Sequence, residues 1–168
     1  MLQKVKRSNT AAAPEDWHEK PLQERPGFLI RRLHQIHVAL FMEECAEENI
    51  TPVQYSILSA LDHMGTAEQI VLSRAVGLDT TNVADVLARL ERQKLIKRRA
   101  SQQDKRMKVV TLTSAGRTLL QRIDANAARA HERTLAPLAP KERARFMRDL
   151  SKVVAFNNDI SRTPVGLR

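Results

Sequence analysis

The feature that most constrains this 168-residue chain is a tight turn between two short helical patterns near its middle. Gly77 follows a first pattern over residues 67–75, and the run Asp79-Thr80-Thr81-Asn82 opens a second one that extends to about Gln93. Glycine tolerates the left-handed backbone that ends many helices, and aspartate, threonine and asparagine cap the first turn of the next. Apolar residues on both sides of this turn predict a helix-turn-helix with a shared core: Leu72, Val76, Leu78, Val83 and Val86.

A basic segment with two strand patterns follows the second helix. Residues 95–99 and 109–112 are short strand candidates, and the polar residues 101–108 connect them. This order predicts a β-hairpin whose loop projects as a wing. Seven cations and one anion lie between Lys94 and Lys108, in a chain of formal net charge +9. The gathered positive charge favours a polyanionic partner, although charge alone would also fit RNA or an anionic membrane.

Longer helical patterns flank this central region. One runs from Phe28 to about Glu48, and Thr51-Pro52-Val53-Gln54 has the cap, proline and glutamine of a second helix start, with an end near Met64-Gly65. Thr113 can cap a helix after the hairpin, and Pro137 and Pro140 separate it from a last helix. The first and last helices carry apolar stripes: Leu29, Leu33, Ile36 and Leu40 in one, and Phe146, Leu150, Val153 and Ile160, interrupted by Asn157, in the other. Pairing with a second copy of the chain would bury these stripes, and packing within one chain is the alternative.

These patterns predict a mainly α protein with a small β-hairpin wing, which is a winged helix-turn-helix with flanking dimerisation helices. Residues 1–25 are polar and aperiodic, apart from Trp17, and are expected to form a flexible tail. Residues 26–162 are the expected folded domain. Within it we expect a DNA-binding module over residues 51–112 and dimerisation helices over about 27–48 and 113–160.

Several classes of protein are disfavoured by the sequence. No apolar run is long enough to span a membrane and no secretory signal is evident, so we expect a cytoplasmic protein. Glycine loops for phosphate and nucleophile motifs are lacking, so we do not expect an enzyme or a cofactor. His34, His37 and Cys45 do not lie on one face of a helix, so the sequence disfavours a metal site formed by them. The glutamates around Cys45, the single cysteine, should raise its thiol pKa, which favours an inert thiol over a redox sensor.

Four segments in this order resemble the MarR family of winged-helix regulators: Thr51 to Tyr55, Leu87 to Ile96, Asp104 to Arg106, and Leu112 to Gly116. The resemblance covers about residues 28–160. It implies a homodimer with a dimerisation lobe and two DNA-reading lobes, a palindromic double-stranded operator, repression of transcription, and a small aromatic carboxylate effector. A narrower resemblance, over Leu33 to Ala39 and Phe41 to Glu44, is to NicR-type repressors of nicotinate catabolism and implies 6-hydroxynicotinate as inducer. A constitutive DNA-binding protein without an effector and a thiol-based redox regulator are the alternatives.

The expected DNA contacts come from the second helix of the turn and from the wing. The polar face of that helix offers side chains that can read base edges: Thr81, Asn82, Asp85 and Arg89. Asp79 and Thr80 are expected mainly to cap the helix, and Asp85 either pairs with Arg89 or reads a base. In the wing, Asp104 can orient Arg106 toward the minor groove, as the resemblance implies, or form only a solvated ion pair. Four other cations of the segment are expected to be phosphate contacts or plain solvated cations: Lys105, Lys108, Arg98 and Arg99.

An aromatic carboxylate requires an apolar slot and a cation or hydrogen-bond donor. The first two helices offer candidates of this kind, which form our expected effector-binding set: Arg31, Arg32, His34, His37, Phe41 and Tyr55. For each of them a plain packing role is the alternative.

Overall fold

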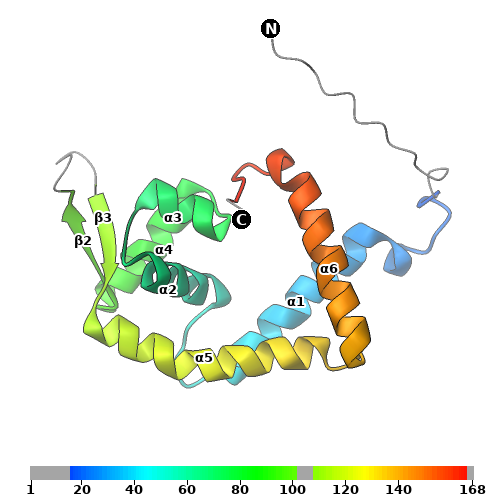
Figure 1. Cartoon of the computed structure of the whole chain (residues 1–168), viewed down its shortest axis with the longest axis horizontal. Helices are drawn as coiled ribbons and strands as arrows, with labels where there is room; N and C mark the ends of the chain where they lie inside the picture. The colour runs from blue at the N-terminus through cyan, green and yellow to red at the C-terminus, as the bar shows by residue number, and fades with distance from the viewer. Residues whose placement is uncertain (1–15, 102–107, 166–168) are drawn as a thin grey trace, which may run out of the picture. The chain divides into compact units, whose positions relative to one another are not determined.

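The computed structural model describes residues 16–101 and 108–165 and divides the chain into two units, residues 1–35 and 36–168 (Figure 1). The first unit holds a short 3-10 helix, η1 (Leu22–Glu24), and the start of α1 (Pro26–Glu44), which continues into the second unit. The Arg25 guanidinium donates to the carbonyl oxygens of His18, at 3.1 Å, and Lys20, at 3.0 Å, and so ties the chain just before α1. The flexibility of residues 1–25 and the domain boundaries stay predictions.

The second unit contains the predicted helix-turn-helix and hairpin strands, which confirms the expected fold class. Its elements are α2 (Pro52–Met64), β1 (Thr66–Glu68), α3 (Gln69–Val76), α4 (Thr80–Arg92), β2 (Ile96–Ala100), β3 (Lys108–Leu112), α5 (Ser114–Leu135), α6 (Pro140–Asn157) and a 3-10 helix, η2 (Asn158–Ile160). The strands form an antiparallel sheet in the order β1-β3-β2. Within the described residues, none of these helices is both long and apolar enough to cross a lipid bilayer.

Two boundaries differ from the sequence-based expectation. Residues 66–68 form a third strand, whereas the pattern assigned Ala67 to a helix; Ala67 pairs with Val110, so a partner 43 residues away decides its conformation. The first helix ends at Glu44 rather than near Glu48. Residues 45–49 form turns, Asn49 adopts a φ of 51°, and the chain then buries Ile50 in the core. Burial of Ile50 therefore outweighs the continuation of a polar helical turn.

The predicted helix ends are present in atomic detail. Thr51 and Gln54 form a reciprocal capping box, with N–H donors 3.2 Å and 2.9 Å from the two side-chain oxygens. Gly65 and Gly77 end α2 and α3 with φ angles of 71° and 67°, a backbone region that favours glycine. The Thr113 hydroxyl accepts the Gly116 N–H at 3.0 Å. These local contacts fix where α2, α3 and α5 begin and end.

The core lies between α2, α3, α4, the sheet and α5, and Phe41 at the end of α1 and the following Cys45 also belong to it (Figure 1). Side chains with no measurable exposure come from each of the helices α2 to α5, including Leu58, Leu72, Leu87 and Ile123. At its edge, Gly116 packs so closely against the preceding segment that an added Cβ would lie 2.0 Å from the Leu95 carbonyl oxygen. In contrast, α6 has no buried residue in the protomer.

Candidate nucleic-acid interface and ligand site

The second helix of the turn, α4, has one buried face and one exposed polar face. Val83, Leu87 and Leu90 have 0% exposure and fix the helix against the core. The four side chains expected to read bases are all exposed: Thr81, Asn82, Asp85 and Arg89. Burial on one side therefore holds the helix rigidly while the other side stays accessible to a large ligand such as duplex DNA.

The start of α4 is organised by Asp79. One carboxylate oxygen accepts the Asn82 N–H at 2.9 Å, and the other accepts the Asn82 side-chain amide at 2.6 Å. Asp79 is thus the cap, as expected, whereas Thr80 is the first helical residue and its carbonyl accepts from the Gln69 side chain at 3.0 Å. A bidentate contact with adenine uses both the donor and the acceptor of an asparagine amide. The bond to Asp79 leaves the second N–H donor and the oxygen of the Asn82 amide for such a contact.

Further along α4, Asp85 and Arg89 are four residues apart and could have neutralised each other. Among the described residues, these two side chains form no ion pair. Each therefore points its charge into solvent independently of the other, which leaves Arg89 available to an anion.

A brace connects α4 to the wing strand β2. The Arg98 Nε donates to a Glu91 carboxylate oxygen at 2.7 Å, Nη2 donates to the same oxygen, and the Arg98 N–H donates to the other oxygen at 3.3 Å. The Arg98 guanidinium holds the pKa of Glu91 below its usual range. We expected Arg98 to be a phosphate contact or a solvated cation, and the structure shows a brace instead. The sequence spacing of Glu91 and Arg98 did not indicate this ion pair, because the chain reverses direction between them at Lys94, which has a φ of 60°.

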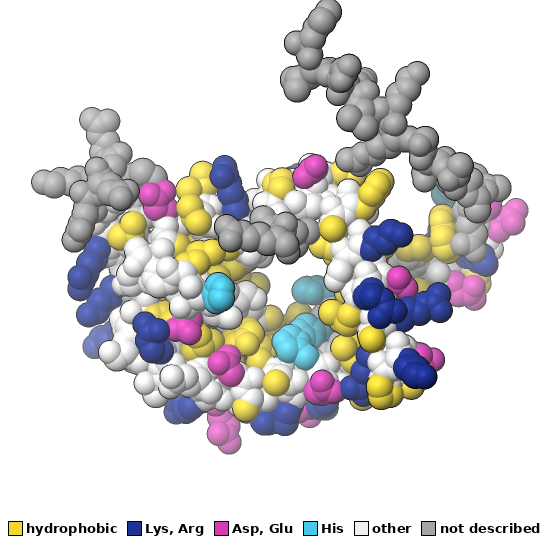
Figure 2. Space-filling model, viewed as in Figure 1, with side chains coloured by type: hydrophobic (Ala, Val, Ile, Leu, Met, Phe, Trp, Pro, Cys, Tyr) yellow, Lys and Arg dark blue, Asp and Glu magenta, His cyan; other side chains and the backbone are white. Residues whose placement is uncertain are grey.

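The other cations of this segment that the structure describes are exposed: Lys94, Lys97, Arg99 and Lys108. Figure 2 shows Lys and Arg side chains along the edge of the module formed by β2. Lys108 opens β3 opposite Ala100, so it lies at the base of the wing. Asp104, Lys105 and Arg106 lie outside the described residues.

The candidate effector residues of the first unit are exposed on α1: Arg31, Arg32 and His34. The Arg31 guanidinium lies 5.3 Å from the centre of the Phe28 ring and also donates to the Gln35 side chain at 3.2 Å. Arg31 is therefore held along its own helix in this unit, and Arg32 and His34 are accessible to solvent.

In the second unit, the candidates occupy different depths. Phe41 is 1% exposed and its ring centre lies 5.5 Å from that of Tyr55, at an angle of 47°. Phe41 thus packs in the core beneath Tyr55, and its expected role in binding an effector stays a prediction. His37 and Tyr55 are half-buried and are placed better for contact with a small molecule.

The His37 ring is oriented by two residues of α5. Its Nδ1 lies 2.9 Å from the Thr134 hydroxyl, and that hydroxyl donates its one proton to the Ala130 carbonyl at 2.7 Å. The contact with this hydroxyl fixes the orientation of the His37 ring. The ring also stacks on His131, with centres 5.2 Å apart and planes 9° apart. The sequence did not indicate His131 because it lies 94 positions from His37 and belongs to no recognisable sequence motif.

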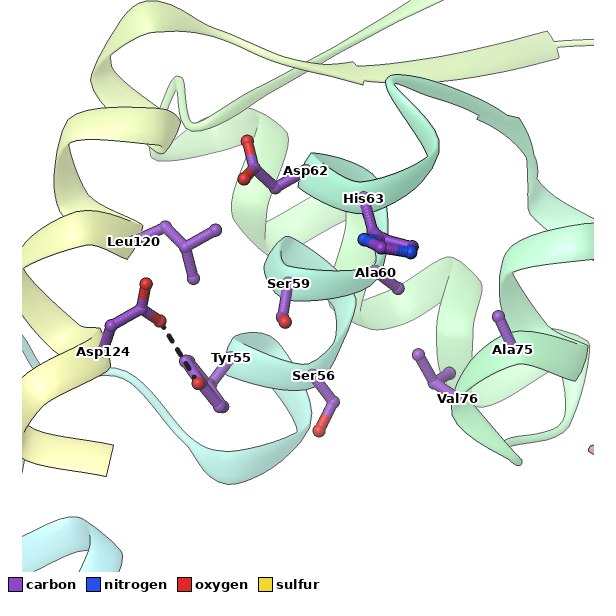
Figure 3. A pocket seen from close by; sticks show the side chains of 10 residues that line it. All are labelled: Tyr55, Ser56, Ser59, Ala60, Asp62, His63, Ala75, Val76, Leu120 and Asp124. Atoms are coloured by element: carbon purple, nitrogen blue, oxygen red, sulfur yellow. Dashed lines mark hydrogen bonds between the residues drawn. The ribbon is translucent and has the colours of Figure 1, made fainter. Parts of the chain in front are cut away.

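A groove of 540 Å³ lies between α2, α3 and α5 (Figure 3). In it, the Tyr55 hydroxyl donates to Asp124 at 3.2 Å, and burial and the Asp124 carboxylate raise the pKa of Tyr55. Asp62 is paired with Arg117 at 2.6 Å. His63 contributes an imidazole ring to the same lining. The full lining is Tyr55, Ser56, Ser59, Ala60, Asp62, His63, Ala75, Val76, Leu120 and Asp124.

Known proteins resemble this chain over the same helices and strands. The model of the MarR family matches residues 50–108, from the residue before the α2 cap to the start of β3. A crystal structure of PcaV, a transcriptional regulator of Streptomyces coelicolor, in complex with its natural ligand is 34% identical; the match covers 86% of this chain and 98% of PcaV, with a TM-score of 0.74. This chain belongs to the MarR family.

Two further relatives of this MarR-family regulator have related descriptions. The transcriptional repressor NicR of Pseudomonas putida is 27% identical over 149 residues, which cover 89% of this chain and 94% of NicR. BpsR of Bordetella bronchiseptica, whose structure describes how 6-hydroxynicotinic acid regulates its DNA binding, is 30% identical. That match covers 80% of this chain and 96% of BpsR, with a TM-score of 0.76.

The single cysteine of this MarR-family protein lies in the core. Cys45 has 0% exposure, and burial, followed by the nearby Glu48 and Glu44 carboxylates, raises the pKa of its thiol. The sequence predicted this direction from the glutamates, and the structure adds burial as the first cause. A raised pKa and a buried sulfur both slow attack on an oxidant. Within the described residues, no group of three or more His, Cys, Asp or Glu side chains is arranged around a possible metal ion.

Proposed function

We propose that this MarR-family regulator is a homodimeric transcriptional repressor that binds a palindromic operator in double-stranded DNA and is released by a small aromatic carboxylate. The observation that carries the proposal is the exposed polar face of α4, held by a buried apolar face within the segment that matches the family. A helix presented in this way fits the major groove. Arg89, Thr81, Asn82 and Asp85 are the proposed base contacts, and Lys108 is a proposed phosphate contact.

Two further parts of the proposal, the wing contacts and the localisation, rest on the sequence and on the proposed role. Asp104, Lys105 and Arg106 stay the wing contacts that the sequence predicts. A repressor acts on chromosomal DNA, so we propose a cytoplasmic protein that acts by binding rather than by catalysis.

The dimer is supported by the exposed apolar face of α6. Leu150, Val153 and Phe156 are 38%, 55% and 66% exposed in the protomer. Figure 2 shows hydrophobic side chains at the surface of the arm formed by α6. Burial of such a stripe is favourable, and two-fold pairing with a second copy is the simplest way to bury it. Two copies of α4 would then contact two half-sites, which explains a palindromic operator.

The effector proposal rests on relatives and on local chemistry. BpsR is described as regulated by 6-hydroxynicotinic acid and NicR as a repressor, so 6-hydroxynicotinate is the first candidate. In the second unit, the Tyr55 hydroxyl and the oriented His37 ring are the proposed ligand contacts. The carboxylates of Asp62 and Asp124 disfavour an anion nearby, so the carboxylate of the effector should approach His63 or a hydroxyl. Arg31, Arg32 and His34 stay sequence-based predictions for the first unit.

The test begins by selecting duplexes from a random pool with the purified protein. We expect an inverted repeat, and titration with 6-hydroxynicotinate should weaken binding to it by at least about tenfold, with benzoate and nicotinate as matched acids. Tyr55→Phe removes only a hydroxyl and should reduce the response to the acid, whereas Ser114→Ala, which removes an exposed hydroxyl outside the groove, should not.

Each negative result has a separate meaning. If no duplex is enriched, the DNA-binding proposal is wrong. If the repeat is bound equally with every acid in the series, the protein is a constitutive binder. A response to peroxide that Cys45→Ala abolishes would instead show a thiol-based regulator, against the burial of that sulfur.

A further inference from the structure

The last described residues of the chain, 161–165, return to the DNA-binding module after α6. We call residues 161–165 the C-terminal strap. Figure 1 shows the last coloured residues of the chain beside α3. Pro164 and Val165 of the strap share a groove of 890 Å³ with residues from the end of α2 and from α3: His63, Met64, Val71, Arg74 and Ala75.

The strap is held at its end by one side chain. The Asn158 amide nitrogen donates to the Val165 carbonyl at 2.9 Å, and the Val165 N–H donates to the Asn158 amide oxygen at 2.9 Å. An asparagine amide satisfies both polar groups of one peptide residue in this arrangement, as a neighbouring strand would. Within this closed loop, the Ser161 N–H donates to the Asn158 carbonyl at 3.1 Å, and the Ser161 hydroxyl accepts the Thr163 N–H at 3.2 Å. The loop therefore has a defined shape rather than a loose end.

The strap meets the module at the turn between α3 and α4. A Cβ built at Gly77 would lie 3.1 Å from Val165 Cγ2, so the valine methyl rests against the glycine that forms this turn. Met64 and Val71, which are 41% and 45% exposed, offer apolar surface in the same groove. The apolar side chains of the strap and of this groove can bury surface against each other, which is favourable, although His63 and Arg74 also line the groove.

We propose that the C-terminal strap ties the far end of α6 to the α3–α4 turn and so restricts how the reading helix α4 can move relative to α6. The chain leaves the module covalently through α5 and α6, and the strap returns to it, which closes a ring of α5, α6, strap and module. A ring attached at two points has fewer accessible positions than an arm attached at one. This inference rests on the proposed function only for its consequence, which is that α4 is positioned for an operator before DNA arrives.

The first test needs no DNA. The Gly77 and Leu78 N–H groups both donate to the Ser73 carbonyl, so their hydrogen exchange reports how firmly the turn is held. Asn158→Leu removes both bonds to Val165, and Val165→Asp places a charge in the apolar contact. Each should speed exchange at residues 77 and 78 by about threefold to tenfold, the effect of losing one or two such contacts. Arg162→Ala, an exposed change within the strap, is the matched control and should match the unmodified chain.

The outcomes separate the strap from general stability and from DNA binding. Unchanged exchange at the turn in both variants would overturn the proposal, and so would equally faster exchange at the buried Val110 of β3, because that would mean general loosening. With the selected operator, both variants should bind about threefold to tenfold more weakly than Arg162→Ala, since α4 is then less restricted. If a variant binds the operator with full affinity although exchange at the α3–α4 turn is faster, the strap does not position α4 for DNA. If the unmodified chain selects no duplex, the proposed function fails while the exchange result still decides the strap.

Discussion

The DNA-binding module and α6 use apolar side chains in opposite ways. In the module, from α2 to the first turns of α5, Leu58, Leu87 and Ile123 are fully enclosed by the same chain. In α6, Leu150 and Val153 repeat at helical spacing and none of the eighteen residues is buried. Equal periodicity therefore leads to different outcomes, because burial depends on what lies opposite the stripe.

We infer from this difference that the module gains its stability from its own core, whereas α6 gains stability from contact with another surface. A closed core supplies its own stability, whereas an exposed stripe gains stability only when a second surface covers it. The module should therefore respond to mutations through its folding, and α6 through assembly. Four mutations test that contrast.

The largest effect should come from breaking the closed core at Gly116. In Gly116→Ala, the new Cβ would lie 2.0 Å from the Leu95 carbonyl oxygen, so the backbone of α5 or of residue 95 must shift. We expect the free energy of unfolding to fall by about 3 kcal/mol, as measured by urea titration. Gly27→Ala is the control, because nothing lies within 4 Å of its Cβ, and it should be neutral or stabilising by up to about 1 kcal/mol. Equal effects of the two changes would contradict the packing argument.

A charge on the exposed stripe should break assembly rather than folding. Leu150→Glu should raise the dissociation constant of the dimer about a hundredfold, the loss of one central interface side chain. Light scattering across a concentration series measures this, and thermal unfolding should still be cooperative. Lys152→Glu, a charge reversal at an exposed position two residues further along α6, is the control. If Leu150→Glu stays fully dimeric, α6 is not the dimer interface.

A change on the outer face of α4 should sharpen the contrast by altering binding alone. Arg89 is exposed and forms no ion pair among the described residues, so Arg89→Ala should leave the melting temperature unchanged. Loss of an arginine contact with a base should weaken operator binding by about tenfold to a hundredfold. Fluorescence anisotropy with the selected duplex measures it. Arg122→Ala on α5 should bind like the unmodified chain, and a similar loss there would point to general charge instead of a specific contact.

The smallest effect concerns the ion pairs between α1 and α5. Arg129 and Arg133, which contact Glu44 at 2.8 Å and 2.7 Å, lower the pKa of Glu44 from its ordinary value of 4.5. A lowered folded-state pKa stabilises the fold above pH 4.5 and loses that contribution as the pH falls below it. Glu44→Gln should therefore melt slightly earlier than the unmodified chain at pH 7, and the gap should shrink below pH 4.5. Glu47→Gln, at an exposed turn position, should show no such pH-dependent gap; a constant gap for Glu44→Gln would exclude its charge as the cause.

The sequence by itself determined the local features of this protein. Thr51, Asp79 and Thr113 cap helices by contacts within three residues, and Gly77 needs a backbone angle that few other residues accept, so their positions could be predicted without a partner. The exposed face of α4 followed from the same periodicity that places Val83 and Leu87 in the core.

Tertiary structure alone decided the contacts between distant positions. The pairing of Ala67 with Val110, the stack of His37 on His131 and the contact of Val165 with Gly77 join residues that share no pattern in the sequence. The physical reason is that capping and periodicity depend on neighbours along the chain, whereas these contacts depend on which surfaces the finished core brings together.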